Sequence, residues 1–167
     1  MPIKNRKELF VMMLSNLRQA EEHSTKFFQE ASLVAEDSKI KDALIARAFV
    51  SNKVISTIDE CFKLINEQPM KPTVRLVEIF AEDFRKELAE IQAPEAKALF
   101  VLVKVSILHH MQLGAFTALT AAADMTGHYG VGVLLESCLG DKIAFMERTR
   151  RNIRKLVEAN AATKVAA

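Results

Sequence analysis

The sequence has few of the residues that build turns, and it has no tryptophan. Five glycines and four prolines occur in 167 residues, whereas a sheet protein needs turn residues at each of its many reversals. Half of the residues (50%) are apolar and 26% are charged, which is typical of a soluble globular domain. A chain of this length can form one hydrophobic core. We therefore expect a single all-α domain over residues 1–160, followed by a disordered tail over 161–167.

A charge excess of one sign, a leader segment and cysteine clusters are also lacking. The net charge of +2 gives no strong attraction to nucleic acid or to an anionic membrane. Cys61 and Cys138 lie within apolar helical patterns without metal-finger spacing, and buried free thiols of this kind indicate a reducing compartment. The N-terminal residues lack the apolar run of a signal peptide. These features predict a cytoplasmic protein that binds neither nucleic acid nor a membrane.

The most basic segment, Arg148–Lys155, does not change that expectation. Nucleic-acid binding would need a continuous face of cations along the phosphates, with aromatic residues or a known motif beside it, and the sequence shows neither. Cations near the C-terminal end of a helix are stabilised by the helix dipole. We therefore interpret this segment as a solvated helix face.

Helical periodicity, interrupted in four places, divides the chain into five segments. Asn5–Glu8 has the form of a capping box that starts the first helix. Pro69 and Pro72 exclude a continuous helix after the second segment, and Thr73 is a candidate cap for the third. The expected helices cover about 5–35, 39–66, 73–91, 95–126 and 131–160. Four long helices with a short one in the middle connection predict a four-helix bundle with the long crossover typical of ferritin-like topologies.

The expected helix over 95–126 is apolar almost all the way round. A helix without a polar face is either buried or spans a membrane. Lys104 and the central group His109–Gln112 argue against a membrane, so we expect this helix in the core. Polar side chains at the centre of a buried helix need hydrogen-bond partners there. A functional site is therefore expected around this central group.

Four short pieces of the sequence carry a family resemblance. In order along the chain, they are Glu8–Val11, Gln19–Glu21, Cys61–Pro69 and Leu134–Glu136. On these pieces the chain resembles the YciE/YciF family of ferritin-like proteins, which are bacterial and associated with stress. The resemblance implies a bundle that commonly pairs and that binds two metals between its helices. The usual ligands are one glutamate from each of two helices and a Glu-x-x-His pair from each of the other two.

The sequence departs from this metal-binding pattern. It contains no Glu-x-x-His motif. The resemblance places a ligand at Glu21, which is present, but the second helix has no acidic or imidazole ligand over Arg47–Val54. On the last helix the expected acidic positions fall near Lys142 and Met146, with Asp141 beside them. We therefore expect no metal cofactor, since a di-metal centre needs several carboxylates to balance its charge.

Cations at the former ligand positions suggest what replaces the metals. The helical stripes that contain Lys142 and Arg47 turn both side chains inward, where a cation could compensate the Glu21 carboxylate. We therefore predict a buried Glu21–Lys142 or Glu21–Arg47 ion pair, with Gln112 and His109 hydrogen-bonded around it. The alternative is that Lys142 extends to solvent between the helices.

The leading functional hypothesis is a non-catalytic, ferritin-like homodimer that has lost the usual di-iron site. The resemblance implies a stress-related role, as a structural or interaction protein. We expect the pairing surface on the outward sides of the first two helices, because these carry more phenylalanines than one inner stripe requires. These residues are Phe27, Phe28, Phe49 and Phe62.

Two other functions are compatible with the sequence. The first is a metal-dependent oxidoreductase or an iron-handling protein with iron or manganese in an unusual site. Its ligands would be Glu21, His109, Gln112 and Asp141. The second is a small-ligand binder, because small residues on three helices could leave a cavity. These are Ser51, Gly114 and Gly140.

Overall fold

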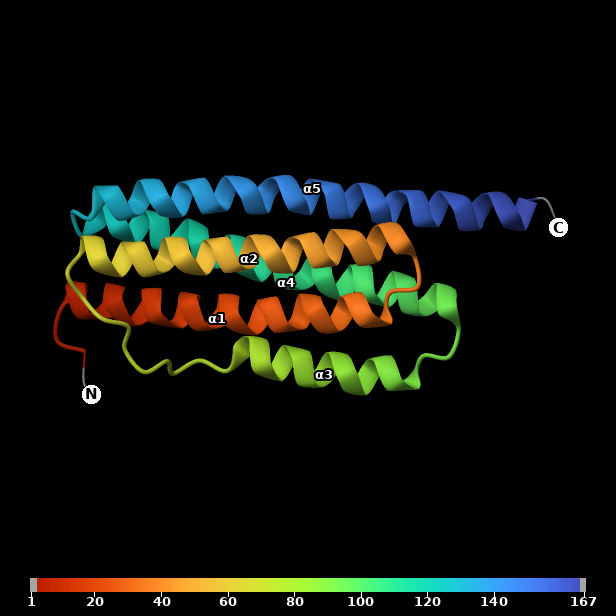
Figure 1. The fold of residues 1–167 in the computed structure, drawn as a ribbon, viewed down its shortest axis with the longest axis horizontal. Helices are drawn as coiled ribbons and strands as arrows, with labels where there is room; N and C mark the ends of the chain where they lie inside the picture. The colour runs from red at the N-terminus through yellow and green to blue at the C-terminus, as the bar shows by residue number, and fades with distance from the viewer. Residues whose placement is uncertain (1–2, 166–167) are drawn as a thin grey trace.

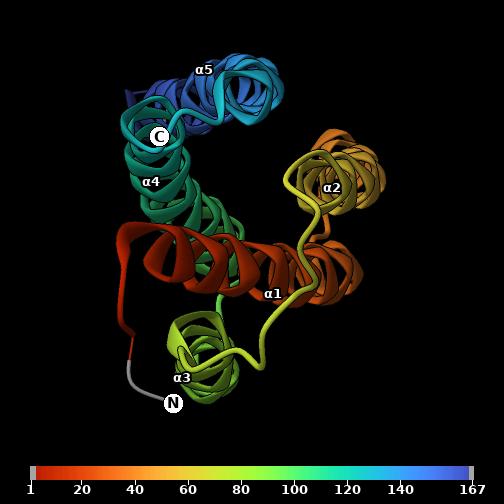
Figure 2. The same ribbon diagram turned by 90° about the vertical axis from the view of Figure 1, so that its left-hand side faces the viewer.

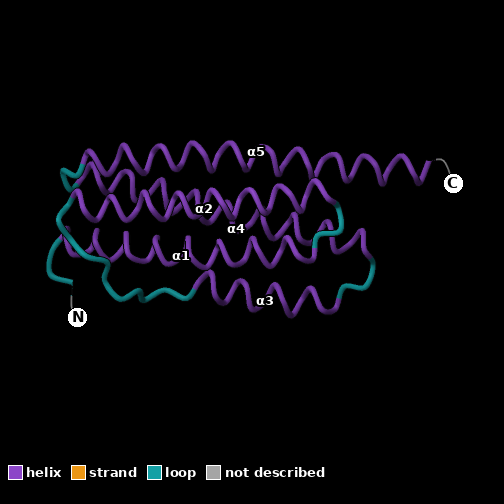
Figure 3. Tube along the Cα trace, viewed as in Figure 1, coloured by secondary structure: helices purple, strands orange, loops and turns teal. Residues whose placement is uncertain are grey.

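The computed structural model describes residues 3–165, which form five α-helices (Figure 1). The helices are α1 (Arg6–Val34), α2 (Ser38–Leu64), α3 (Leu76–Glu90), α4 (Pro94–Met125) and α5 (Tyr129–Val165). Figure 3 shows that only loops connect them, and no strand occurs over 3–165. The predicted all-α fold class is confirmed.

The four long helices form two antiparallel pairs. α1 packs against α2 and α4 packs against α5, while weaker contacts join α2 to α5 and α1 to α4. Figure 2, which looks along the bundle, shows α3 outside this arrangement, beside α1. α3 contacts both α1 and α4 and lies in the long connection between α2 and α4. The predicted ferritin-like bundle, with a short helix in a long crossover, is therefore the observed architecture.

The first two helices each start at a residue whose side chain caps the helix, and the Asn5 cap is the predicted one. Asn5 Oδ1 accepts a hydrogen bond of 2.9 Å from the backbone N–H of Glu8, and Asp37 Oδ1 accepts one of 3.0 Å from Ile40 N–H. Pro94 lies in the first turn of α4. Each cap satisfies a backbone donor that the helix itself leaves free.

The predicted start of α3 at Thr73 is wrong. α3 begins at Leu76, and Arg75 precedes it without a side-chain capping bond. The linker is instead held by α1, because Asn16 Oδ1 accepts a 3.0 Å hydrogen bond from Thr73 N–H. Ser15 Oγ similarly accepts a 2.9 Å bond from the backbone N–H of Met70. Tertiary contacts with α1 thus override the local capping signal.

The last helix is longer than its sequence pattern suggested. We expected it to end near Asn160, with a tail from Ala161, but α5 continues through Val165. Residues 158–165 are rich in alanine and lack glycine and proline, so the chain contains no local signal to stop the helix. Residues 166 and 167 lie outside the described residues.

Two apolar clusters fill opposite ends of the bundle. One contains Phe10, Ile58, Phe116 and Leu135 among its members. The other contains Phe28, Leu44, Phe84 and Leu108 among its members. Between them lies a layer of buried polar side chains that we call the polar belt. The polar belt consists of Glu21, Arg47, Ser51, His109, Gln112 and Lys142.

The outer face of α4 is not buried, contrary to our expectation for this helix. Leu99, Val103 and Ile107 are 39%, 40% and 44% exposed. α4 is also long and apolar enough for a membrane span, with a mean hydropathy of 1.5 in its best 18-residue window, 39% of which is buried. The core helix of a soluble bundle passes the same test. α4 packs on α5, α1 and α3, and these neighbours leave its remaining face uncovered.

Candidate functional site

Glu21 lies at the centre of the polar belt and is 0% exposed. It belongs to the inward stripe of α1, in helical register with two buried apolar residues, Leu17 and Phe28. Lys142 Nζ on α5 donates a hydrogen bond of 2.7 Å to Glu21 Oε1. Gln112 Nε2 on α4 donates a second bond of 2.9 Å to the same oxygen. Three helices therefore meet at one carboxylate oxygen.

Lys142 is completely enclosed. Its side chain is 0% exposed, so the alternative in which it extends to solvent does not hold. Besides its ion pair with Glu21, its ammonium lies 4.7 Å from the centre of the Phe116 ring. An ammonium over an aromatic face is stabilised by the ring quadrupole. The Glu21–Lys142 alternative is thus the ion pair that the structure contains.

Arg47 is not the ion-pair partner of Glu21, so the other predicted alternative does not hold. It is 1% exposed, and its Nε donates a hydrogen bond of 3.2 Å to His109 Nε2. Its guanidinium lies 5.3 Å from the centre of the Phe28 ring and 5.5 Å from that of Phe145. Arg47 therefore rests among an imidazole and two aromatic rings, and the nearby Glu21 carboxylate acts on it only through space.

Burial dominates the electrostatics of the belt. It lowers the pKa of His109 to about 2, and the positive charges of Arg47 and Lys142 lower it further. The imidazole is therefore neutral, which lets Nε2 accept the hydrogen bond from Arg47. Burial also lowers the pKa of Lys142 to about 8, against the raising effect of Glu21. The pKa of Arg47 is lowered by burial too, with Glu21 again opposing.

The belt is not a fully connected hydrogen-bond network. Within the described part of the chain, five of its buried atoms lack a hydrogen-bond partner. They are Glu21 Oε2, Arg47 Nη2, Ser51 Oγ, His109 Nδ1 and Gln112 Oε1. A buried polar group without a partner costs stability. The belt therefore opposes folding unless its charges compensate one another.

The side chains of the belt do not fit a di-metal centre. Glu21 is its one carboxylate, and the cations Lys142 and Arg47 face it where other carboxylates would be needed. Asp141 lies on the exposed side of α5, so the alternative ligand set that included it is not brought together. Over residues 3–165, no three histidine, cysteine or acidic side chains lie close enough to hold one metal ion.

Other expected features lie elsewhere than the sequence suggested. Of the four phenylalanines proposed for pairing, three are buried in the bundle core and Phe49 is 76% exposed. The proposed cavity beside Ser51 is also wrong, because Gly114 and Gly140 both face outward while Ser51 is buried. α3 covers Phe27, whose ring centre lies 4.9 Å from that of Phe84, whereas none of the described helices covers Phe49.

The two cysteines are buried free thiols, as expected. Burial raises the pKa of the Cys61 thiol to about 12, and it raises the pKa of Cys138 as well. A thiol with a raised pKa carries little thiolate and is a poor nucleophile. Neither cysteine is therefore a candidate catalytic group.

Sequence analysis missed a groove of about 240 Å³ outside the belt. Its walls come from the middle of α1, the start of α3 together with Val74 of the preceding linker, and the middle of α4. Representative lining residues are Met13, Gln19, Val77, Met111, Gln112 and Ala115. No local pattern marks such a groove, because three distant segments form it. Gln112 belongs both to the groove and to the polar belt.

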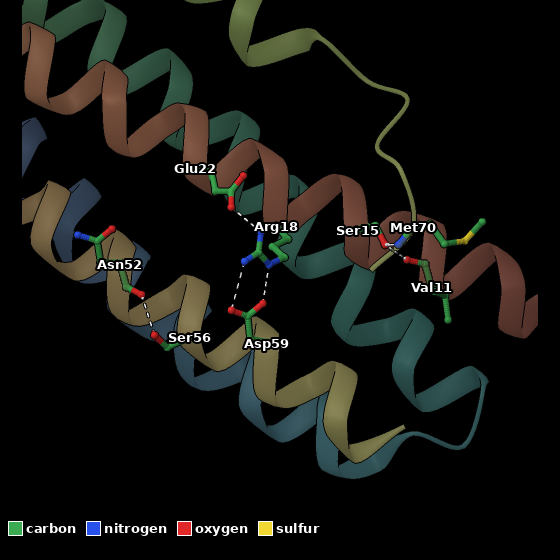
Figure 4. A network of polar contacts seen from close by, with 8 residues as sticks. All are labelled: Val11, Ser15, Arg18, Glu22, Asn52, Ser56, Asp59 and Met70. Atoms are coloured by element: carbon green, nitrogen blue, oxygen red, sulfur yellow. Dashed lines mark hydrogen bonds and ion pairs between the residues drawn. The ribbon is translucent and has the colours of Figure 1, made fainter. Parts of the chain in front are cut away.

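A second polar network lies on the surface of the bundle (Figure 4). Arg18 Nε on α1 donates to Asp59 Oδ1 on α2 at 2.5 Å. Arg18 Nη1 also contacts Glu22 one turn further along α1. Figure 4 shows the guanidinium between these two carboxylates, at the junction of the two helices. This network therefore joins α1, the helix that carries Glu21, to α2 on the solvent side of the bundle.

Comparison with known proteins places most of the chain in one family. Residues 5–162 match the family described as Domain of unknown function, DUF892. Among curated proteins, none matches the chain. The fold is shared with the Escherichia coli stress protein YciF, with a TM-score of 0.88 and 18% identity, covering 93% of this chain and 99% of that chain.

Two further solved structures have the same fold. YcfI of Rhodopseudomonas palustris, proposed as a structural protein, gives a TM-score of 0.85 at 18% identity, covering 89% of this chain and 94% of that chain. A protein from Xanthomonas campestris gives a TM-score of 0.75 at 16% identity, covering 96% of this chain and 99% of that chain. The chain therefore belongs to the DUF892 family, the YciE/YciF-like family of ferritin-like bundles.

Proposed function

We propose that this protein is a non-catalytic ferritin-like bundle that acts as a structural or interaction protein. The observation that carries this proposal is the buried Lys142–Glu21 ion pair of 2.7 Å. The ammonium compensates the carboxylate that a metal ion would otherwise neutralise, and Arg47 adds a second cation to the same layer. Chemistry that needs a bound metal therefore has no suitable ligand set in this layer.

The roles described for two proteins of the same fold support a structural role. The E. coli protein is a stress protein, and the R. palustris protein is proposed to be structural. A stress-related structural role is therefore the biological part of the proposal. It rests on analogy, because proteins of one fold perform many functions.

We further propose that two copies pair through the outer face of α4. This face carries a continuous exposed stripe without a charged side chain, which we call the α4 stripe. It contains Leu99, Val103, Ile107, His110, Gly114, Ala121 and Met125. A large exposed apolar surface marks an interaction site. The stripe runs nearly the whole length of the helix, so two antiparallel copies related by a two-fold axis can cover each other's stripes.

Paired charge substitutions test this assembly. Val103→Glu with Ile107→Glu places two carboxylates on the α4 stripe. Ile45→Glu with Phe49→Glu is a matched control at the same spacing on α2, where Ile45 is 51% and Phe49 76% exposed. We expect sedimentation to give the mass of two chains for the wild type and the control, and of one chain for the α4 variant. A wild-type mass of one chain, or dissociation by the α2 variant alone, would overturn the assembly.

Metal content tests the absence of redox chemistry. The purified protein is incubated with ferrous iron and, separately, with manganese, and bound metal is measured by elemental mass spectrometry. We expect less than about a tenth of an equivalent per chain, because two buried cations repel a metal ion. About one or two equivalents that require Glu21 and His109 would establish the metal-dependent alternative instead.

A further inference from the structure

The groove outside α1 and α4 has the character of a small-molecule site. Its volume is about 240 Å³, and its walls are mostly methionine, leucine, valine and alanine side chains. Val74 and Leu76 at its edge are 48% and 55% exposed, so a bound molecule would cover apolar surface that the fold leaves in water. Most drug-sized ligands need a larger pocket, so this groove suits a molecule of one or two rings.

The polar atoms of the groove define what such a molecule must carry. Gln112 is 3% exposed, and its Nε2 donates to Glu21 Oε1 at 2.9 Å. This bond fixes the orientation of the amide, because a carboxylate accepts hydrogen bonds and does not donate them. Gln112 lines the groove, whereas Glu21 does not. Among the described residues, the buried amide oxygens Gln112 Oε1 and Gln19 Oε1, both on side chains that line the groove, have no hydrogen-bond donor.

The charged groups at the edge of the groove are already paired. His23 Nε2 lies 3.0 Å from Glu78 Oε1, and Glu78 also receives the guanidinium of Arg75 at 2.7 Å. An ionic ligand would therefore find no free counter-charge at these positions. The groove offers apolar walls and two hydrogen-bond acceptors, which together favour an uncharged ligand with a donor.

We propose that this groove binds a small, uncharged, largely apolar molecule whose hydroxyl or N–H group donates a hydrogen bond to Gln112 Oε1. Aromatic alcohols and indole-like compounds are the matching chemical class. Because the other end of the same amide holds Glu21, a bound donor completes the hydrogen bonding of Gln112 and stabilises the folded protein. This inference is independent of metal binding and of pairing through the α4 stripe.

Titration with two matched probes tests the proposal on the intact protein. 2-Naphthol carries a hydroxyl donor, whereas 2-methoxynaphthalene has a similar apolar body and no donor. We expect 2-naphthol to bind on the order of 5-fold more tightly, the effect of one neutral hydrogen bond. Equal affinities, or binding of neither probe, would overturn the proposal.

The location of binding is tested with a variant and with the wild type. Ala115→Phe places a ring in the groove without removing a belt residue and should abolish binding, whereas Ala46→Phe, at an exposed position of α2, should not. In the wild type, the methyl resonances of Met13 and Met111 should shift on titration, while that of Met125, outside the groove, stays in place. Unchanged Met13 and Met111 resonances, or full binding by Ala115→Phe, would place the probe elsewhere and overturn the proposal.

Discussion

Two of the ion pairs that α1 forms, Glu21–Lys142 and Arg18–Asp59, differ mainly in their contact with water. Glu21 and Lys142 are both 0% exposed, whereas Arg18 and Asp59 are 27% and 40% exposed. The N–O distances are similar, 2.7 Å in the belt and 2.5 Å at the surface. Geometry alone therefore does not distinguish the two pairs. What differs is the cost of removing the charges from water.

The pKa shifts of the cations show this difference directly. The hydrogen bond with Asp59 is the main influence on Arg18, whose pKa is raised. Burial is the main influence on Lys142, whose pKa is lowered to about 8 despite the nearby carboxylate. At the surface the partner decides the shift, and in the belt desolvation decides it. Removing one partner of a buried pair therefore leaves the other charge uncompensated and destabilises the fold.

Lys142→Met should have the largest effect on stability. It leaves the Glu21 carboxylate buried with Gln112 as its remaining hydrogen-bond donor. Loss of one partner of a buried pair costs about 3–5 kcal/mol. We expect urea denaturation to show a decrease of this size in the free energy of unfolding.

A double substitution distinguishes an uncompensated charge from a simple loss of packing. Glu21→Gln with Lys142→Met removes both charges and keeps an amide beside Gln112. Because neutral replacement of a buried pair is often harmless, the double variant should regain most of the lost stability. If Lys142→Met alone leaves stability unchanged, or if the double variant is as unstable as the single one, an uncompensated charge at Glu21 is not the cause of the lost stability.

His109→Gln should change how stability depends on pH. The pKa of His109 is lowered from 6.5 to about 2 in the folded protein, so between these values the unfolded chain binds a proton that the native imidazole cannot. The wild type therefore loses about 1.4 kcal/mol of stability for each pH unit below 6.5 through this group. The variant lacks this contribution, so its unfolding free energy should fall less steeply.

The neighbouring histidine provides the control for this measurement. His110 is exposed, and its Nδ1 lies 2.8 Å from the Ser106 carbonyl of its own helix. Denaturant unfolding at several pH values between about 4.5 and 6.5 should give His110→Gln the wild-type slope. A wild-type slope in His109→Gln would show that the buried imidazole is not the source of acid sensitivity.

The sequence predicted the fold well because its local signals and its periodicity agree. Asn5, Asp37 and Pro94 mark helix starts through contacts within a few residues. The inward stripes likewise placed Lys142 and Glu21 in the core, since helical spacing alone determines which face a residue shares.

What the sequence missed depends on contacts between distant segments. Arg47 was one of two predicted ion-pair partners of Glu21, but its guanidinium bonds to His109, and this choice depends on side-chain packing across two helices. The burial of Phe27 and the exposure of Val103 depend on where α3 lies, beside α1. Periodicity identifies an apolar face, but it does not show which neighbour covers that face.

Arg18→Met should have the smallest effect and thereby complete the contrast between the two pairs. It removes a cation that links α1 to α2 at the surface and leaves Asp59 and Glu22 free to be solvated. We expect a loss of about 0.5–1 kcal/mol at low ionic strength. Because salt screens exposed charges, the difference from the wild type should shrink at about 1 M salt, whereas that of Lys142→Met should persist. Urea denaturation of both variants at two salt concentrations measures these differences. If Arg18→Met loses as much unfolding free energy as Lys142→Met, and salt changes neither loss, then burial does not distinguish the two ion pairs.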